Sequence, residues 1–364
     1  MKDGVAVDGW IFFAVAALLA VGITMVLSTS YIYAQERFGD GTYFFRKQLI
    51  AAGVGLLLLV LAAATPVAVY RKLAYPLMGF VLLVLVLLLV PGIGVARGGA
   101  RRWLVLGGFA FQPAELAKLS LLLYLAHSLA KKADKMTSFS VGVLPHLLVG
   151  GVFLGLIVVQ PDLGTAVTLG LLLLLMLFVA GVKLTHLGLI GLAAVPVVVV
   201  AVMGAEYRLR RLMTFMDPWR DASKSGFQII QSYIAFGSGQ LVGRGLGESR
   251  QKMFYLPEAH TDFIFSVIGE EMGLLGALAV LALFAVIIVR GLGLAGKIEE
   301  PFSQYLAFGI TTLLGLQALI HMGVVMGLMP TKGLVLPFIS YGGSAMVMNM
   351  IEAGVLLSVS RGRR

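Results

Sequence analysis

The stretch YLPEAHTDFIFSVIGEEMG, residues 255–273, places acidic side chains at the start of a long apolar run and inside it. Asp262 stands at the beginning of the run, and Glu270 and Glu271 lie within it. A carboxylate in hydrocarbon is costly, and one that persists there usually has a partner or a function. The stretch therefore predicts a membrane helix whose acidic groups need an explanation.

The composition agrees with a membrane protein. The chain has 364 residues, of which 59% are hydrophobic and 13% charged, and its mean hydropathy is +0.96. A soluble domain carries about 25% charged residues. Apolar segments of about 20 residues are long enough to span a bilayer, and they occur at about 10–30, 48–68, 73–92, 113–130, 142–160, 164–182, 186–204, 262–290, 304–328 and 341–360. We predict an all-α, polytopic integral membrane protein with about ten transmembrane helices, forming a single domain over residues 1–364.

Charge patterning predicts the orientation. The N-terminal MKDGVAVDGW lacks a basic segment and a cleavage site, so we expect a retained first span and no signal peptide. The short inner connectors of an N-inside arrangement carry more Lys and Arg than the short outer ones, which predicts cytoplasmic termini. The long polar connector at about 205–261 then lies outside the cell. This loop is also basic, which indicates either an anionic ligand or contact with anionic lipid headgroups.

A small and polar stripe runs along the helix expected from Asp262. At 3.6 residues per turn one face presents Asp262, Ser266, Gly269, Glu270, Gly273, Gly276 and Ala277. Such a stripe packs closely against other helices or lines a cavity. Asp262 either caps the helix or serves as a functional acid at its outer end. Glu271 lies off the stripe, and the sequence names no partner for it.

Two neighbours of Asp262 carry chemistry of their own. His260 either relays or tunes a proton or, as the plainer interpretation, makes an interfacial hydrogen bond. Glu258 follows Pro257 and is expected to shape the loop.

A second group of residues lies in GGARRWLVLGGFAFQPAELAK, residues 98–118. Pro113 fits the first turn of the following helix, and Glu115 and Lys118 are spaced to pair on one helix face. Arg101 and Arg102 beside Trp103 indicate either an interfacial belt or a phosphate grip. The glycines that permit a folded loop here are Gly98, Gly99, Gly107 and Gly108.

Two further motifs interrupt apolar segments. In QPDLGTA, residues 160–166, Pro161 ends one helix and Asp162 is expected to cap the next. In MPTKGLVLPFISYGGSA, residues 329–345, prolines and paired glycines predict a broken or re-entrant segment, and Lys332 is a candidate cation for an anionic group.

The residues alone leave two function classes open. One is an enzyme that acts on a lipid-linked anionic substrate, and the other is a transporter that moves such a lipid. The glycines of GSGQLVGRGLGESRQK lack the strand–helix context of a nucleotide site. The chain contains no cysteine, which excludes disulfides and Cys-ligated metals.

Taken together, the motifs resemble the SEDS family (shape, elongation, division and sporulation) of bacterial cell-wall polymerases. The resemblance covers nearly the whole chain, and GLGESRQKMFYLPEAHTDF and PTKGLVLPFISYGGS are more similar to its division subgroup than to its elongation subgroup. The motifs are GARRW (99–103), QPAELAK (112–118), QPDLGTA (160–166), FQIIQSYIAFGSGQLVGRGLGESRQKMFYLPEAHTDFIFSVIGEE (227–271) and MPTKGLVLPFISYGGSA (329–345).

The resemblance implies a ten-helix peptidoglycan glycosyltransferase that polymerises lipid II during septal cell-wall synthesis. It places the catalytic carboxylate at Asp262, which would act as the general base of an inverting transfer. A lipid II flippase and an elongation-type polymerase are the alternatives.

The lipid-linked pyrophosphate needs cations as it leaves; Arg102, Lys118, Lys252 and Lys332 are candidates for that role. No protein metal site is expected, and Mg²⁺ or Mn²⁺ is a candidate helper. The residues expected to bind substrate are Arg102, Gln112, Glu115, Lys118, Lys252, Glu258, His260, Lys332 and Ser340.

The resemblance also implies partners and a location. The chain lacks the combination of Ser-x-x-Lys and Lys-Thr-Gly that penicillin-binding enzymes use, so a separate class B penicillin-binding transpeptidase is expected, with other divisome membrane proteins. No nucleic acid is expected. The predicted location is the bacterial cytoplasmic (inner) membrane at the division septum, with the active site on the outer face.

Overall fold

The computed structural model describes residues 7–97, 100–106, 109–253 and 256–362. The four loop glycines at 98, 99, 107 and 108 and the first residues of the chain lie outside this range. The elements in order are α1 (Gly9–Phe38), α2 (Tyr43–Ala64), α3 (Val67–Leu87), β1 (Val95–Arg97), β2 (Ala100–Leu106), β3 (Phe109–Phe111), α4 (Pro113–Lys131), η1 (Ala133–Lys135), η2 (Phe139–Val143), α5 (Leu144–Val159), α6 (Leu163–Val179), α7 (Leu184–Met203), α8 (Glu206–Met216), η3 (Pro218–Asp221), α9 (Phe227–Gly239), α10 (Ile264–Ala295), α11 (Pro301–Val325) and α12 (Gly343–Arg361).

Each predicted span coincides with a helix, which confirms the helical membrane fold. Within the described ranges, eight helical segments are long and apolar enough to cross a membrane. The shorter apolar α6 and the 19-residue α4, which carries Glu115 and Lys118, occupy the two remaining predicted spans. The third predicted span was expected to begin at about residue 73. The helix begins at Val67 instead, so Arg71 and Lys72 lie in the first turns of α3 and not in a connector.

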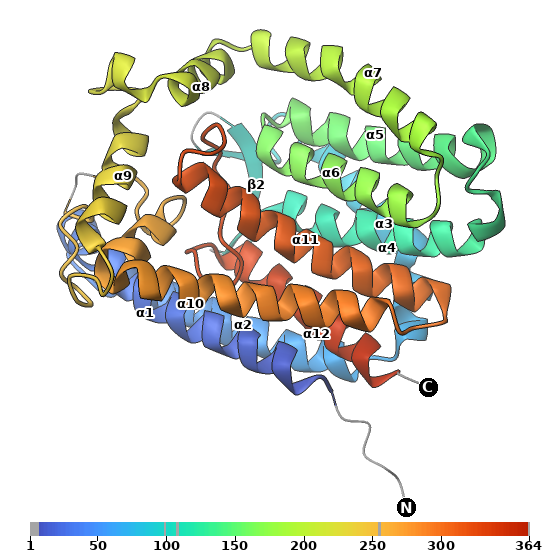
Figure 1. The fold of residues 1–364 in the computed structure, drawn as a ribbon, viewed down its shortest axis with the longest axis horizontal. Coiled ribbons are helices and arrows are strands. Elements are labelled where there is room, and N and C mark those ends of the chain that lie inside the picture. Colours follow the sequence, from blue (N-terminus) through green and yellow to red (C-terminus); the bar gives the residue numbers. More distant parts are fainter. Residues whose placement is uncertain (1–6, 98–99, 107–108, 254–255, 363–364) are drawn as a thin grey trace, which may run out of the picture.

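The helices run roughly along one direction and pack through small residues (Figure 1). A Cβ added to Gly354 of α12 would lie 2.4 Å from the Leu59 carbonyl oxygen of α2, and Gly55 of α2 faces Met350 in the same way. Such close approach is the usual basis of helix association in membranes. By contrast, α7 has no buried residue, so its apolar side chains face outward.

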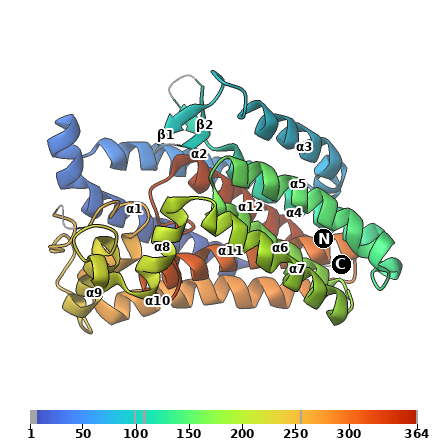
Figure 2. The same cartoon turned by 90° about the horizontal axis from the view of Figure 1, so that it is seen from above.

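Both ends of the described chain lie at the same end of the bundle. The backbone N–H of Asp8 donates to the Ser360 hydroxyl (3.1 Å), and the Asp8 carboxylate accepts from Arg290 (2.7 Å). Figure 1 shows the start of α1 and the end of α12 at that end of the bundle, and both views show α9 at the opposite end (Figure 2). The turn that precedes α10 lies at the opposite end, so Asp262 is far from the termini along the bundle (Figure 1).

Two connectors are more ordered than the sequence predicts. The segment 95–111 forms a three-stranded antiparallel sheet in the order β1-β2-β3, where a folded loop was expected. The connector 205–261 contains α8, η3 and α9. α8 combines Arg208, Arg210 and Arg211 with apolar residues, a composition that suits a helix lying along a membrane surface.

Candidate functional site

The site is built around the turn that precedes α10. The carbonyl of Glu258, a residue with a φ of 55°, accepts hydrogen bonds from the backbone N–H groups of Thr261 and Asp262 (both 3.1 Å). The Glu258 carboxylate also accepts from the Thr261 hydroxyl (3.0 Å). Glu258 therefore shapes this loop, as its position after Pro257 predicted.

Asp262 does not cap the helix, which corrects one of the two interpretations of its role. The N-cap of α10 is Phe263, and α10 begins at Ile264 without a side-chain cap. Burial raises the pKa of the Asp262 carboxyl to about 7, repulsion from Glu258 adds to the increase, and the positive charge of Arg211 on α8 opposes it. Near neutral pH a carboxyl with this pKa is present in both its ionised and its protonated form, so it can accept and release a proton.

The broken segment between α11 and α12 packs directly on this turn. The Ser340 hydroxyl donates to the Thr261 carbonyl (2.7 Å) and accepts from the backbone N–H of Leu336 (2.9 Å). The N–H of Tyr341 donates to the His260 carbonyl (2.9 Å). Gln48 of α2, a residue that the sequence did not single out, donates to the Ser340 carbonyl (3.2 Å). The segment is thus non-helical and held by protein, as its prolines and glycines predicted.

Gly333 brings this segment alongside Asp262. A Cβ added to Gly333 would lie 3.2 Å from Oδ2 of Asp262, so the backbone passes close to the carboxyl. Lys332 precedes Gly333 and is half-buried, and burial lowers the pKa of its ammonium. The charges that act on Asp262 are those of Glu258 and Arg211, and the Lys332 ammonium forms no ion pair with Asp262 among the described residues.

His260 belongs to an aromatic cluster. Its ring stacks on Tyr33 (centroids 5.7 Å apart) and contacts Phe44 (4.7 Å) and Tyr341 (5.7 Å). Burial lowers the pKa of His260 in spite of the nearby Glu258 charge. A neutral, stacked imidazole supports the plainer interpretation, in which His260 packs the turn against α1 and α2.

Lys252 is the missing partner of Glu271. Its ammonium lies 2.8 Å from the Glu271 carboxylate, and the side chains of both residues are buried. The Ser28 hydroxyl of α1 donates to Glu271 (2.7 Å) and accepts from Lys252 (2.9 Å). Lys252 is thus engaged in a buried ion pair, at a different place from Lys332.

The loop that carries Lys252 docks into a break in α10. Gly273, with a φ of 66°, interrupts the helix, and loop backbone replaces the hydrogen bonds that the interruption removes. A Cβ at Gly243 or at Gly273 would meet the opposing backbone at 2.2 and 2.4 Å, which explains both glycines. The replacing bonds are Leu274 N to Gln240 O (2.9 Å), Leu275 N to Leu241 O (3.1 Å), Arg244 N to Glu270 O (3.0 Å) and Gly245 N to Glu271 O (3.0 Å).

The Glu270 carboxylate completes this docking. It accepts from the backbone N–H groups of Arg250 (3.1 Å) and Gln251 (3.3 Å) and from the hydroxyls of Ser238 and Ser249. Glu270 therefore has a structural role, and the polar stripe on α10 is a packing surface for the loop.

Arg102 and Gln112 are held at another turn. Arg102 donates to the carbonyls of Gln160 (2.9 Å) and Pro161, and the Gln112 amide donates to Asp162 (3.2 Å). Asp162 accepts from the backbone N–H of Thr165 (3.1 Å), which confirms its predicted cap of α6. These contacts fix the β1–β3 sheet to the start of α6.

Glu115 and Lys118 form the predicted pair inside α4. Their charged atoms are 2.7 Å apart, and both side chains are buried. The Lys118 ammonium also donates to the Gln317 amide oxygen of α11. The pair therefore lies among the helices rather than beside the turn at Asp262.

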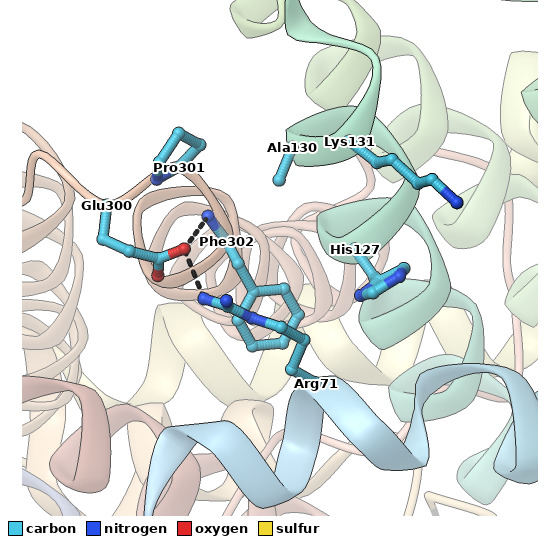
Figure 3. A pocket seen from close by; sticks show the side chains of 7 residues that line it. All are labelled: Arg71, His127, Ala130, Lys131, Glu300, Pro301 and Phe302. Carbon is cyan, nitrogen blue, oxygen red and sulfur yellow. Dashed lines mark hydrogen bonds and ion pairs between the residues drawn. The ribbon is translucent and has the colours of Figure 1, made fainter.

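A separate basic hollow of about 220 Å³ lies at the end of the bundle where α11 begins (Figure 3). Arg71 lies over the Phe302 ring (5.0 Å) and pairs with Glu300, while His127 and Lys131 line the other side. Because α10 begins at the other end, this hollow is distinct from the candidate site.

The described part of the chain has no cluster of three or more His, Cys, Asp or Glu side chains that could hold a metal ion. Mg²⁺ commonly uses only one or two carboxylates together with phosphate oxygens. The carboxylates of this turn are those of Asp262 and Glu258. They are too few to hold a metal ion alone, but they suit an ion that is also bound by phosphate oxygens of the substrate.

Comparisons with known proteins identify the family. The family model described as "Cell cycle protein", FtsW/RodA/SpoVE, matches residues 9–364. The chain is 47% identical over 344 residues to a probable peptidoglycan glycosyltransferase FtsW of Geobacter sulfurreducens, covering 94% of this chain and 92% of that protein. It is 41% identical over 345 residues to stage V sporulation protein E of Bacillus subtilis, covering 94% of each.

Comparison with solved structures indicates the same family. One similar chain comes from a structure of a peptidoglycan synthase complex that concerns the coordination of polymerization and crosslinking. The TM-score is 0.79 and the identity 32%, and 98% of each chain is covered. The rod shape determining protein RodA of Thermus thermophilus has a TM-score of 0.73 and 30% identity, covering 100% of this chain and 99% of that one. The chain therefore belongs to the FtsW/RodA/SpoVE family of cell cycle proteins, the SEDS family that its motifs predicted.

Proposed function

We propose that this chain is a peptidoglycan glycosyltransferase that joins lipid II disaccharide units into glycan strands, with Asp262 as general base. The relatives named FtsW support the activity. The observation that carries the assignment of the base is the Asp262 carboxyl, whose pKa of about 7 suits proton transfer and which the Lys332–Gly333 backbone lies against.

The transfer is a single displacement. A sugar hydroxyl of the acceptor attacks the anomeric carbon of the donor while Asp262 takes the hydroxyl proton. The bond from the anomeric carbon to the pyrophosphate breaks, and the leaving oxygen keeps the electron pair. An α-linked donor then gives a β-linked product, so no covalent glycosyl-enzyme is needed.

The developing charge on the pyrophosphate requires cations nearby. Lys332 stays a candidate because its neighbour Gly333 lies against the Asp262 carboxyl. Arg211 of α8, which the sequence did not single out, is a cation whose charge acts on Asp262. Lys118 and Lys252 are each engaged in a buried ion pair. A divalent ion held by Glu258 and the pyrophosphate oxygens would supply further charge neutralisation.

Reconstitution of the purified protein with labelled lipid II tests this function. We expect glycan ladders on a gel that resolves chain length. Movement of lipid II between leaflets without any ladder would favour the flippase alternative and contradict the proposal.

The rate should depend on pH through Asp262. The base is active as a carboxylate, and the pKa of Asp262 is about 7. The polymerisation rate at saturating lipid II should therefore rise with pH up to about 7 and fall about tenfold per unit below it. Initial rates across this range check the expectation, and a rate that stays constant from about pH 5 to 8 would contradict the role of Asp262.

Gly333→Ala should slow the reaction. The new methyl group would lie 3.2 Å from Oδ2 of Asp262, so either the carboxyl or the segment must shift by a few tenths of an ångström. Small displacements of reacting groups are costly, and we expect a rate loss on the order of tenfold. Gly293→Ala is the matched control because its Cβ meets nothing within 4 Å. Equal rates for the two variants would show that Gly333 does not set the position of Asp262.

We expect this chain to work at the division septum of the cytoplasmic membrane, with both termini inside and Asp262 facing out. The Lys and Arg bias of the short connectors supports this orientation. The greater identity to FtsW proteins than to RodA supports the division role.

A class B penicillin-binding transpeptidase is the expected partner. The similarity to a chain of a peptidoglycan synthase complex supports such an assembly. Co-expression and purification in mild detergent should yield a stable complex with a higher polymerisation rate than the chain alone. Failure to co-purify, together with an unchanged rate, would contradict this partnership without affecting the assignment of Asp262.

A further inference from the structure

A cluster of buried polar side chains lies among α4, α11 and α12, below the candidate site. Glu115 and Lys118 come from α4, Gln317 from α11, and Glu352 and Asn349 from α12. Each is at most 5% exposed. Gln317, Asn349 and Glu352 lie on two helices that are long and apolar enough to cross a membrane, and Glu115 and Lys118 lie on α4, which occupies a predicted span. Charged groups inside a membrane are rare and usually functional.

The carboxylate of Glu352 has no partner. Neither of its oxygens accepts or donates a hydrogen bond within the described residues, and its exposed fraction is 0%. The charged groups that act on Glu352 are Lys118 and Glu115. The Lys118 ammonium, however, is already bound to the Glu115 carboxylate and to Gln317.

The cations of α1, α2 and α3, which also pack on α12, are exposed: Arg37, Arg46, Lys47, Arg71 and Lys72. Gln48 is the buried polar residue of α2, and α11 contributes His321. The charged groups at the termini end of α12 are Asp8, paired with Arg290, and Arg361. Two ionised carboxylates and one ammonium would leave a net negative charge in the membrane interior, which is strongly unfavourable.

We infer that Glu352 carries a proton at neutral pH and forms, with Glu115 and Lys118, a buried protonation site in the membrane part of the protein. A protonated carboxyl gains an O–H donor. Asn349, one turn earlier on the same helix, has a buried Oδ1 that lacks a partner among the described residues. The spacing of three residues allows the Glu352 O–H to donate to this oxygen, which satisfies both orphaned groups.

A chain of contacts links this site to Asp262. Gln317, bound to Lys118, is one helical turn from His321, whose Nδ1 lies 2.7 Å from the Leu334 carbonyl oxygen. Leu334 follows Gly333, which lies against the Asp262 carboxyl. Loss of the proton from Glu352 would create a second carboxylate competing for Lys118, and would weaken the Lys118–Gln317 bond that anchors α11 at this point.

Infrared spectroscopy of the protein in lipid nanodiscs tests the proton directly. Because Asp262, with a pKa of about 7, also holds a proton near neutral pH, the comparison is made in the Asp262→Asn background. There the protein at neutral pH should show the carbonyl stretch of a protonated carboxylic acid, shifted in deuterium oxide, and Glu352→Gln should remove this band. Glu36→Gln, at an exposed carboxylate, is the matched control and should retain it. Absence of the band, or its persistence in Glu352→Gln, would overturn the inference.

Two further measurements test whether the charge of Lys118, and not a bound cation, sets the protonation of Glu352. In Glu115→Gln the Lys118 ammonium is free to pair with Glu352, so Glu352 should ionise and its band should disappear; persistence of the band would contradict the charge balance. If the melting temperature instead depends on Na⁺ or K⁺ and no acid band is present, a cation occupies the cluster and the inference is wrong.

The consequence for catalysis rests on the proposed function, whereas the infrared result does not. As pH rises above neutrality, ionisation of Glu352 should lower the polymerisation rate, and Glu352→Gln should lose this decrease while retaining the rise that Asp262 produces. A decrease identical in wild type and Glu352→Gln would separate the protonation site from the active site.

Discussion

Replacing Asp262 with asparagine should reduce the rate of glycan polymerisation by about 10²–10⁴-fold, the usual contribution of a general base. Asparagine keeps the size of the side chain and cannot accept the acceptor's proton. Because Asp262 neither caps α10 nor forms an ion pair within the described residues, the substitution removes no contact that holds the fold. The decisive measurement is the rate of ladder formation from labelled lipid II.

The fold of the variant provides the control for this experiment. Asp262→Asn should elute as the wild type does on size exclusion and should unfold at a similar temperature. Asp262→Glu should retain part of the activity, because it moves a carboxylate without removing it. If a well-folded Asp262→Asn protein polymerises at nearly the wild-type rate, another group is the base.

Replacing Lys252 with methionine should destabilise the protein by about 3–5 kcal/mol, the usual cost of leaving one member of a buried ion pair without the other. Lys252 and Glu271 are both buried, and Ser28 contacts each of them. The loss of the ammonium leaves the Glu271 carboxylate uncompensated between α1 and α10. Thermal unfolding in detergent measures the effect.

The double variant Lys252→Met/Glu271→Gln should recover most of this stability, because no uncompensated charge remains. Lys131→Met, at an exposed position on α4, is the control and should change little. An unchanged unfolding temperature in Lys252→Met, accompanied by loss of activity, would contradict the structural role and would return Lys252 to the candidates that bind pyrophosphate.

Hydrophobic length determined much of the architecture from sequence alone. An apolar run of about 20 residues is long enough for a helix to cross a bilayer, and each predicted span corresponds to a helix. Local chemistry also predicted the Asp162 cap and the Glu115–Lys118 pair, because both depend on residues within one helical turn. Asp262 was singled out because an acid beside an apolar run requires an explanation, and the resemblance to the SEDS family, not the residue pattern, gave it the role of base.

Tertiary structure decided which polar residues meet. The sequence placed Arg102, Lys118, Lys252 and Lys332 together as candidates. The fold gives the first three to carbonyls or carboxylates elsewhere, and of the segment that carries Lys332 it brings Gly333 against Asp262.

The partner of Glu271, the docking of the 240–252 loop at Gly273 and the isolation of Glu352 depend on contacts between segments far apart in the chain. Hydropathy and helical periodicity report only on neighbours within a few turns. Contacts between distant segments follow instead from how the helices pack, and the sequence of one segment does not specify its neighbours in space.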